Sequence, residues 1–172
     1  MYGQTSGVAG EALRGLESAY PTAMRYLRSA YDAGRAGRDV RTYGGRLIRV
    51  GTIPDGLDED RARAAMASRG RFARNAVIQG AAAEFFKSWA ATVRARTTPI
   101  DARIVLCLHD ELLLHVPTAH AHAASHLLRD CLAETARRWT AQRSVRFVVE
   151  ISIVHRWSEA KGAPAINLTQ SA

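Results

Sequence analysis

Apolar residues recur at helical spacing along the first 34 residues of the chain. One face of the predicted helix collects four of them, namely Val8, Ala12, Leu16 and Ala19. Pro21 is predicted to open a second helix, because the first turn is where a helix tolerates proline best. Gly34 and Gly37 predict the end of that helix, since glycine is the usual residue just past a helix terminus.

The next segments alternate between turn-forming and helical patterns. Residues 41–50 predict a short hairpin that turns at Gly44-Gly45, and residues 51–59 predict a loop rich in proline, glycine and aspartate. Residues 60–96 return to a helical pattern. A break in this helix is predicted near Gly70, because glycine weakens a helix interior.

Two apolar runs, residues 104–108 and 112–116, flank the polar triplet His109-Asp110-Glu111. Apolar runs of this length predict buried strands, and three residues between them predict a hairpin. Residues 119–139 then predict a helix with one apolar face. Residues 145–154 alternate apolar and polar positions, which predicts a last strand with one face turned inward.

Strands interleaved with amphipathic helices predict an α+β fold. We expect an antiparallel sheet built from the 104–116 hairpin and the 145–154 strand, backed by helices over residues 71–96 and 119–139. The aromatic residues of the first of these helices are expected to pack in the core rather than to form a stacking platform; they are Phe85, Phe86 and Trp89.

Composition points to a globular protein with a polyanionic partner. Hydrophobic residues make up 47% of the 172 residues, which argues against disorder. The formal net charge is +8, and of the 24 lysines and arginines only Lys87 and Lys161 are lysine. Such a surplus of positive charge favours nucleic acid, although many basic domains bind none.

The sequence predicts a cytoplasmic protein that does not enter a membrane. No apolar run approaches the roughly 20 residues that a membrane-spanning helix needs, and the N-terminus lacks the pattern of a signal peptide. Cys107 falls in a predicted strand and Cys131 in a predicted helix, with no metal-ligand spacing between them. Two buried free thiols are therefore expected.

The adjacent carboxylates of Asp110 and Glu111 are the first candidate for chemistry. At the tip of a hairpin whose strands are buried, their repulsion and desolvation would require a compensating cation or strong hydrogen-bond donors. Mg²⁺ fits, because it prefers carboxylate oxygens and keeps water and phosphate as its other ligands. The alternative is a hairpin tip that is simply solvated.

A second candidate lies on the helix predicted over residues 60–96. Arg71, Asn75 and Gln79 stand at i, i+4 and i+8, so they share one face. Side chains of these types donate hydrogen bonds to nucleic-acid edges. A solvated polar face would show the same spacing, and the spacing alone does not choose between the two.

Five segments in the same order resemble the C-terminal part of a family A DNA polymerase of the bacterial DNA polymerase I type, over about residues 1–161. Leu108-His-Asp-Glu-Leu112 resembles the family's motif C, and Arg74–Glu84, reading RNAVIQGAAAE, resembles the segment that precedes it. Tyr2-Gly3 resembles the end of motif B. The other two segments are a T-x-x-G-R hairpin and a closing segment, and they correspond to Thr42 with Gly45-Arg46 and to Trp157–Lys161. Val77 stands where the family often has proline, and Glu84 where it has aspartate.

The resemblance implies a palm sheet preceded by a remnant of the helical fingers. It assigns residues 1–70 to the fingers, residues 71–162 to the palm with its minor-groove helix and motif C hairpin, and residues 163–172 to a flexible tail. The implied activity is two-metal nucleotidyl transfer with Mg²⁺ on primer–template DNA and deoxynucleoside triphosphates. The implied site roles are as follows: Asp110 and Glu111 as catalytic metal ligands, Arg71, Asn75, Gln79 and His109 as DNA contacts, and Tyr2 in the nucleotide pocket.

The resemblance also implies that parts of the polymerase are missing. In the family, motif A supplies the other metal-binding aspartate upstream of motif B, and motif B carries an Arg and a Lys that hold the incoming triphosphate. This chain begins after motif A and after most of motif B. The isolated chain is therefore expected to be inactive and to require the upstream segment. Two alternatives stay open: a stand-alone basic module that binds nucleic acid, and an inert truncated remnant of a polymerase.

Overall fold

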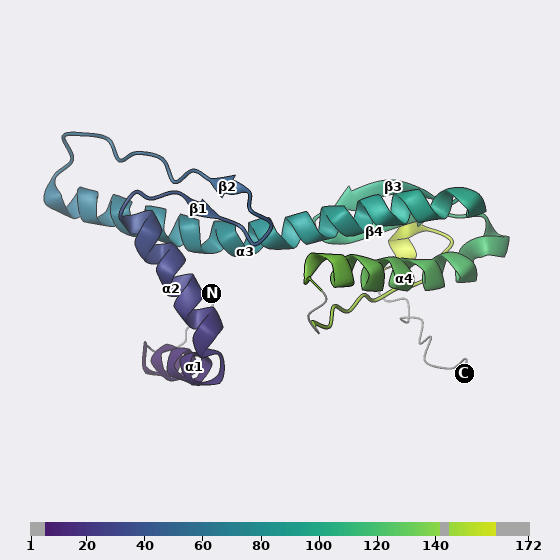
Figure 1. Ribbon diagram of the computed structural model, residues 1–172, viewed down its shortest axis with the longest axis horizontal. Helices are drawn as coiled ribbons and strands as arrows, with labels where there is room; N and C mark the ends of the chain where they lie inside the picture. The colour runs from purple at the N-terminus through teal and green to yellow at the C-terminus, as the bar shows by residue number, and fades with distance from the viewer. Residues whose placement is uncertain (1–5, 142–144, 161–172) are drawn as a thin grey trace. The chain divides into compact units, whose positions relative to one another are not determined.

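The structure is a computed structural model that describes residues 6–141 and 145–160. It divides into two compact units, residues 1–81 and 82–172 (Figure 1). Helix α3, Glu59–Thr97, crosses the boundary and contributes its first part to unit 1 and its last part to unit 2. The described elements are helices and short antiparallel strands, which confirms the predicted α+β class.

Unit 1 begins with two helices, as predicted. Helix α1 covers Ser6–Ala19 and helix α2 covers Pro21–Arg35, with the proline in the first turn of α2. The carbonyls at the end of α2 are capped from α3: Arg69 Nε donates to the Gly34 carbonyl at 2.7 Å and Arg69 Nη2 to the Arg35 carbonyl at 2.8 Å. This cap satisfies carbonyls that a helix end leaves open, and no local pattern predicts it, because Arg69 lies 34 or more residues further along the chain.

The break predicted near Gly70 is wrong, because α3 is continuous through it. The glycine serves a close approach of α2 instead. A Cβ on Gly70 would stand 2.8 Å from Arg35 Cγ and 2.8 Å from Tyr31 Cε2. Gly34 faces the same contact, where a Cβ would stand 2.5 Å from that of Ala73. Both glycines therefore mark where α2 and α3 meet.

The predicted hairpin over residues 41–50 is present and short. Strand β1, Val40–Arg41, pairs antiparallel with β2, Leu47–Ile48. The turn between them lies against α3, because Thr42 Cγ2 is 2.5 Å from where a Cβ on Gly80 would be. The absence of a side chain at Gly80 is what admits this turn so close to the helix.

The core of unit 2 lies between the last part of α3 and helix α4, Ala121–Trp139 (Figure 1). Trp89 Nε1 donates to the Leu128 carbonyl at 3.1 Å, which fixes one helix against the other. Phe85 stacks on Phe147 with ring centroids 4.0 Å apart. The predicted core role of the α3 aromatics is confirmed, and the buried cluster contains Phe86, Trp89, Val93, Cys131 and Leu132.

The central hairpin covers this core with one face only. Strand β3, Arg103–Leu108, pairs antiparallel with β4, Glu111–His115, and Ile104, Leu112 and Leu114 pack on the buried cluster. β3 is nevertheless exposed at several positions, with Val105 58% and Leu108 43% exposed and Cys107 also exposed. The prediction that this strand is buried is thus wrong at these positions, and the predicted burial of Cys107 is wrong with it.

The strand predicted over residues 145–154 is also wrong: these residues form no ladder, and within the described part of the chain the sheets have two strands each. The alternation itself is partly real, since Phe147 and Val149 pack on the core and Ile151 is buried, while Val145 and Ile153 are exposed. Period-two burial needs only apolar contact, whereas a strand also needs ladder hydrogen bonds. Short 3₁₀ turns complete the described elements: η1 (Thr98–Ile100), η2 (Thr118–His120) and η3 (Trp157–Glu159).

None of the helices that the structure describes is both long enough and apolar enough to cross a membrane.

Candidate functional site

The tip of the β3–β4 hairpin holds the candidate metal ligands. The ladder ends at the Leu108–Glu111 pair, so the turn has two residues, His109 and Asp110, rather than the predicted three. His109 takes a φ of 51°, in the left-handed region that asparagine, aspartate and histidine enter more readily than other residues with a side chain. The tight turn places the consecutive residues Asp110 and Glu111 at the end of the ladder, whose register shifts once, between Ile104 and Leu106.

Both carboxylates are exposed, as is His109. In the described ranges neither Asp110 nor Glu111 forms a side-chain hydrogen bond or an ion pair, and no three His, Cys, Asp or Glu side chains gather closely enough to hold a metal ion. Water solvates the two carboxylates, so the desolvation cost expected from buried strands does not arise. The pair still offers the hard oxygen donors that Mg²⁺ takes beside water and phosphate, so the donor set fits that ion.

The row Arg71, Asn75 and Gln79 lies on one exposed face of α3 in unit 1. Its opposite face is buried against the rest of the unit through Ala73 and Val77, which are 0% and 2% exposed. A helix advances about 100° per residue, so the two faces point in nearly opposite directions. Burial of one face therefore fixes the direction of the other, and the three polar side chains stand out together into solvent.

The T-x-x-G-R segment has a local structural role. Arg46 N–H donates to Thr42 Oγ1 at 3.0 Å, and Gly45 N–H donates to the Thr42 carbonyl at 3.0 Å. Gly45 has a φ of 89°, which a residue with a side chain rarely adopts. Threonine, glycine and arginine at this spacing thus close the turn that packs on Gly80.

The structure describes part of the closing segment, Trp157–Lys161, and none of Tyr2-Gly3. Trp157–Glu159 forms the single turn η3, and Glu159 Oε2 accepts from the backbone N–H of His155 and of Arg156, each at 3.3 Å. Tyr2, the candidate for the nucleotide pocket, lies outside the described residues, as do Gly3 and Lys161.

Ion pairs join α3 to α4 in unit 2, where the sequence suggested no site. Arg96 on α3 and Arg138 on α4 both bind the Glu134 carboxylate, at 3.1 Å and 2.6 Å. The hydrogen bond from Arg96 lowers the pKa of Glu134 against a smaller opposing effect of burial. Nearby, burial raises the pKa of the Cys131 thiol, and the charge of Glu134 raises it further. Pairing across two helices depends on the fold, so spacing along the chain could not show it.

Comparison with known proteins shows that the fold and the sequence of this chain are similar to those of DNA polymerases. The POL domain of Pol1 from M. smegmatis, solved in complex with DNA primer-template and dNTP, aligns with 76% of this chain at 24% identity and a TM-score of 0.59, over 23% of its own length. The fold is therefore that of part of a polymerase domain. The family model of DNA polymerase family A matches residues 3–159, and the chain belongs to that family.

Curated relatives include DNA polymerase I of Deinococcus radiodurans, 30% identical over 142 residues, which are 83% of this chain and 14% of that protein. DNA polymerase theta of Caenorhabditis elegans is 38% identical over 77 residues, 45% of this chain and 4% of that protein. The chain thus spans a small part of the relatives it matches.

Proposed function

We propose that this chain is part of a DNA-directed DNA polymerase and that the hairpin tip belongs to its catalytic centre. The observation that carries the proposal is the match to DNA polymerase family A over residues 3–159, within which a tight turn presents Asp110 and Glu111 side by side. The substrates are primer–template DNA and deoxynucleoside triphosphates, and the compartment is the cytoplasm.

Asp110 and Glu111 are the residues that would hold Mg²⁺ in this proposal. When bound, the two ions of a nucleotidyl transferase activate the attacking hydroxyl and neutralise the triphosphate. The contribution of this chain is to fix two carboxylates on a hairpin whose other end is anchored in the core through Ile104 and Leu114. Because the described residues bring no third metal-binding side chain to the pair, the activity requires a further segment of polymerase.

The exposed row on α3 serves a different purpose in the same proposal. An enzyme that copies any sequence must contact base pairs without reading their identity, and the minor groove allows this because its acceptors lie in similar positions for all pairs. Arg71, Asn75 and Gln79 donate hydrogen bonds there, and His109 contacts the primer backbone. Tyr2 lines the nucleotide pocket.

The test makes the substitution Asp110→Asn in two proteins. One is this chain, and the other is this chain joined to the upstream polymerase segment, called the restored enzyme below. Asp110 is exposed and next to Glu111, so removing its charge relieves repulsion and leaves the free energy of unfolding unchanged or raised by a few tenths of a kcal/mol. Nucleotide addition by the restored enzyme is abolished, whereas DNA affinity without Mg²⁺ holds. Gln79→Ala is the control: it weakens binding of primer–template and leaves metal binding intact.

Three results would contradict the proposal. A restored enzyme that adds nucleotides normally with asparagine at position 110 would show that the hairpin carboxylates are not the metal site. An Asp110→Asn chain that unfolds would show that the carboxylate is structural. If restoration yields no activity with the native hairpin while DNA still binds, the stand-alone binding module becomes the better account.

A further inference from the structure

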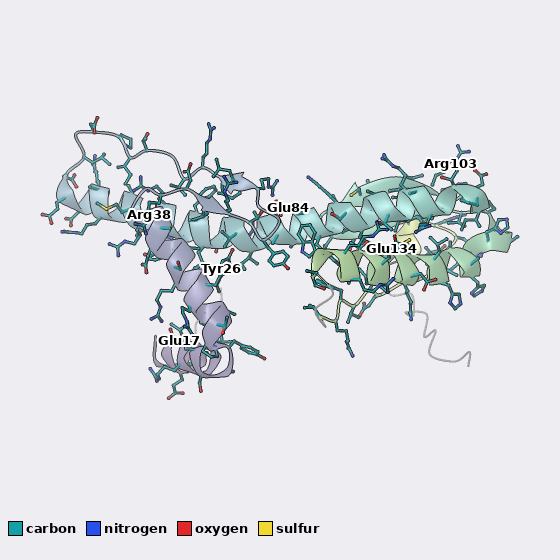
Figure 2. The ribbon with its side chains drawn as sticks, viewed as in Figure 1. Glu17, Tyr26, Arg38, Glu84, Arg103 and Glu134 are labelled. Carbon is teal, nitrogen blue, oxygen red and sulfur yellow. The ribbon has the colours of Figure 1, made fainter. Side chains whose placement is uncertain are left out.

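Unit 2 has a surface hollow of about 690 Å³ that no part of the proposed catalytic centre uses. It is lined by Arg96 from α3 and by Glu134, Arg137 and Arg138 from α4. Figure 2 labels Glu134 on the α4 ribbon. Three guanidinium groups and one carboxylate leave the lining with a surplus of positive charge.

Glu134 holds two of the three arginines in place. Arg96 Nη2 donates to both Glu134 oxygens, at 3.2 and 3.1 Å, and Arg138 Nη2 binds Oε1 at 2.6 Å. The carboxylate is 19% exposed, so solvent screens these bonds only in part. A guanidinium has five N–H donors, and these bonds use the Nη2 group alone. Donors on both side chains thus stay available to a ligand.

Arg137 is the third cation, and it is exposed. Among the described residues it forms no ion pair with a carboxylate within 4.0 Å. A simpler account of all three arginines is that they occupy the last turns of α3 and α4, where positive charge offsets the helix dipole. That account explains charge at each helix end, but it does not explain why cations from two helices converge on one hollow and share one carboxylate.

We propose that this hollow binds the phosphate groups of a nucleic-acid backbone. Guanidinium groups pair with phosphate oxygens through two parallel N–H donors, and two of these groups are already oriented by Glu134. Contact of this kind reads no sequence. The proposal goes beyond the catalytic function, because none of its residues belongs to the hairpin tip or to the exposed row of α3.

The experiment replaces Arg137 and Arg138 by glutamine in the whole 172-residue chain. Affinity for a short, labelled single-stranded oligonucleotide is measured by fluorescence anisotropy, without Mg²⁺ and at several salt concentrations. Each phosphate contact contributes about 0.7 to the slope of log affinity against log salt for single strands, so two contacts contribute about 1.4. We expect the slope to fall by about that amount and the affinity to fall roughly ten- to thirtyfold near 0.1 M salt.

The matched control is Arg61→Gln with Arg63→Gln, which removes the same charge. These arginines pair with acidic neighbours at the start of α3, namely Asp58, Glu59 and Asp60. The affinity should change less than about twofold, because three carboxylates outnumber these two arginines, whereas the hollow has three arginines and one carboxylate. Arg137→Gln alone should lower the affinity for the oligonucleotide roughly fivefold. This variant leaves both ion pairs of Glu134 intact, so it tests the proposal even if the double variant does not fold.

Three results would overturn the proposal. Equal losses in the test and control variants would mean that net charge alone drives binding, and no loss in the test variant would exclude the hollow. Inorganic phosphate that displaces the oligonucleotide as effectively, per phosphate, as unlabelled DNA would identify a free phosphate as the ligand. Asp110→Asn should leave this binding unchanged, so its outcome and that of the catalytic proposal are separable.

Discussion

Thr42 lies so close to Gly80 that a Cβ on the glycine would stand 2.5 Å from Thr42 Cγ2. The contact joins the turn between β1 and β2 to helix α3, and it joins two of the segments by which the sequence resembles its family. Gly80 is buried on the same side of α3 as Ala73 and Val77. The turn therefore packs on the face of α3 opposite the exposed row that is proposed to contact DNA.

Gly80→Ala should destabilise the chain although alanine favours helix. The new methyl group meets a β-branched side chain that is itself 5% exposed, and such overpacking costs about 1–3 kcal/mol. Urea denaturation would measure the loss. Gly15→Ala in α1, where a Cβ meets nothing within 4 Å, should instead gain about 0.5–1 kcal/mol. Adding Thr42→Ser to Gly80→Ala removes the clashing methyl and should recover most of the loss; failure to recover would mean that the clash lies elsewhere.

His109→Gly should stabilise the hairpin slightly. The left-handed region destabilises a residue with a side chain by about 1–2 kcal/mol, and glycine would remove this cost at His109. Glycine also raises the entropy of the unfolded chain, which destabilises the folded state by about 0.5–1 kcal/mol. The net gain is then between zero and about 1.5 kcal/mol, and thermal unfolding would measure it. Asp110→Gly is the control in the same turn, because Asp110 has a negative φ and should lose about 0.5–1 kcal/mol. Equal losses in both variants would show that the turn is not strained at His109.

The two thiols should differ in reactivity. Cys107 is exposed in β3, whereas Cys131 is 1% exposed and burial raises the pKa of its thiol. Only the thiolate reacts, and it must also be reached. Iodoacetamide should therefore label Cys107 in the native chain and Cys131 only in denaturant, as mass spectrometry of the peptides would show. Native labelling of Cys131 would contradict the packing of α4 on α3.

Acid should weaken the contact between α3 and α4 through Glu134. The hydrogen bond from Arg96 lowers the pKa of Glu134 in the folded chain, so the stabilisation is present above the unfolded pKa of about 4.3 and is lost as pH falls through the folded value. Thermal unfolding between about pH 5 and pH 3 should show a smaller loss of stability in Glu134→Gln than in the native chain. Glu11→Gln, at an exposed position on α1, should leave the pH profile unchanged. If the stability of Glu134→Gln falls with pH as steeply as that of the native chain, Glu134 does not contribute to acid unfolding.

Local signals allowed much of the fold to be predicted. Pro21 and Gly34 mark the start and end region of α2, and the polar triplet after Leu108 marks the hairpin tip, because turn and cap preferences act over a few residues. The aromatic residues of α3 were predictable as core, since their spacing repeats with the helix. The same spacing shows that Arg71, Asn75 and Gln79 share a face, which the structure leaves exposed.

Features that depend on distant contacts could not be predicted. Gly70 looked like a helix break, yet its role is set by Tyr31 and Arg35 of another helix. Residues 145–154 alternate as a strand does, but strand formation depends on a partner edge that the alternation does not supply. Glu134 pairs with Arg138 four residues further along the same helix, as helical spacing allows, but it also pairs with Arg96 of another helix, and no spacing along the chain encodes that second pair.

The close approaches at Gly34, Gly70 and Gly80 have a consequence for how this chain tolerates genetic change. Glycine in a helix is ordinarily the easiest residue to improve, and Gly7 and Gly15 in α1 fit that expectation because their surroundings are open. At Gly34 an added Cβ would meet the backbone oxygen of Arg69 at 2.8 Å, and no second substitution can make a backbone oxygen smaller. Saturation mutagenesis should therefore find a site that neighbouring side chains cannot rescue, in contrast to Gly80, whose obstacle is a removable methyl group.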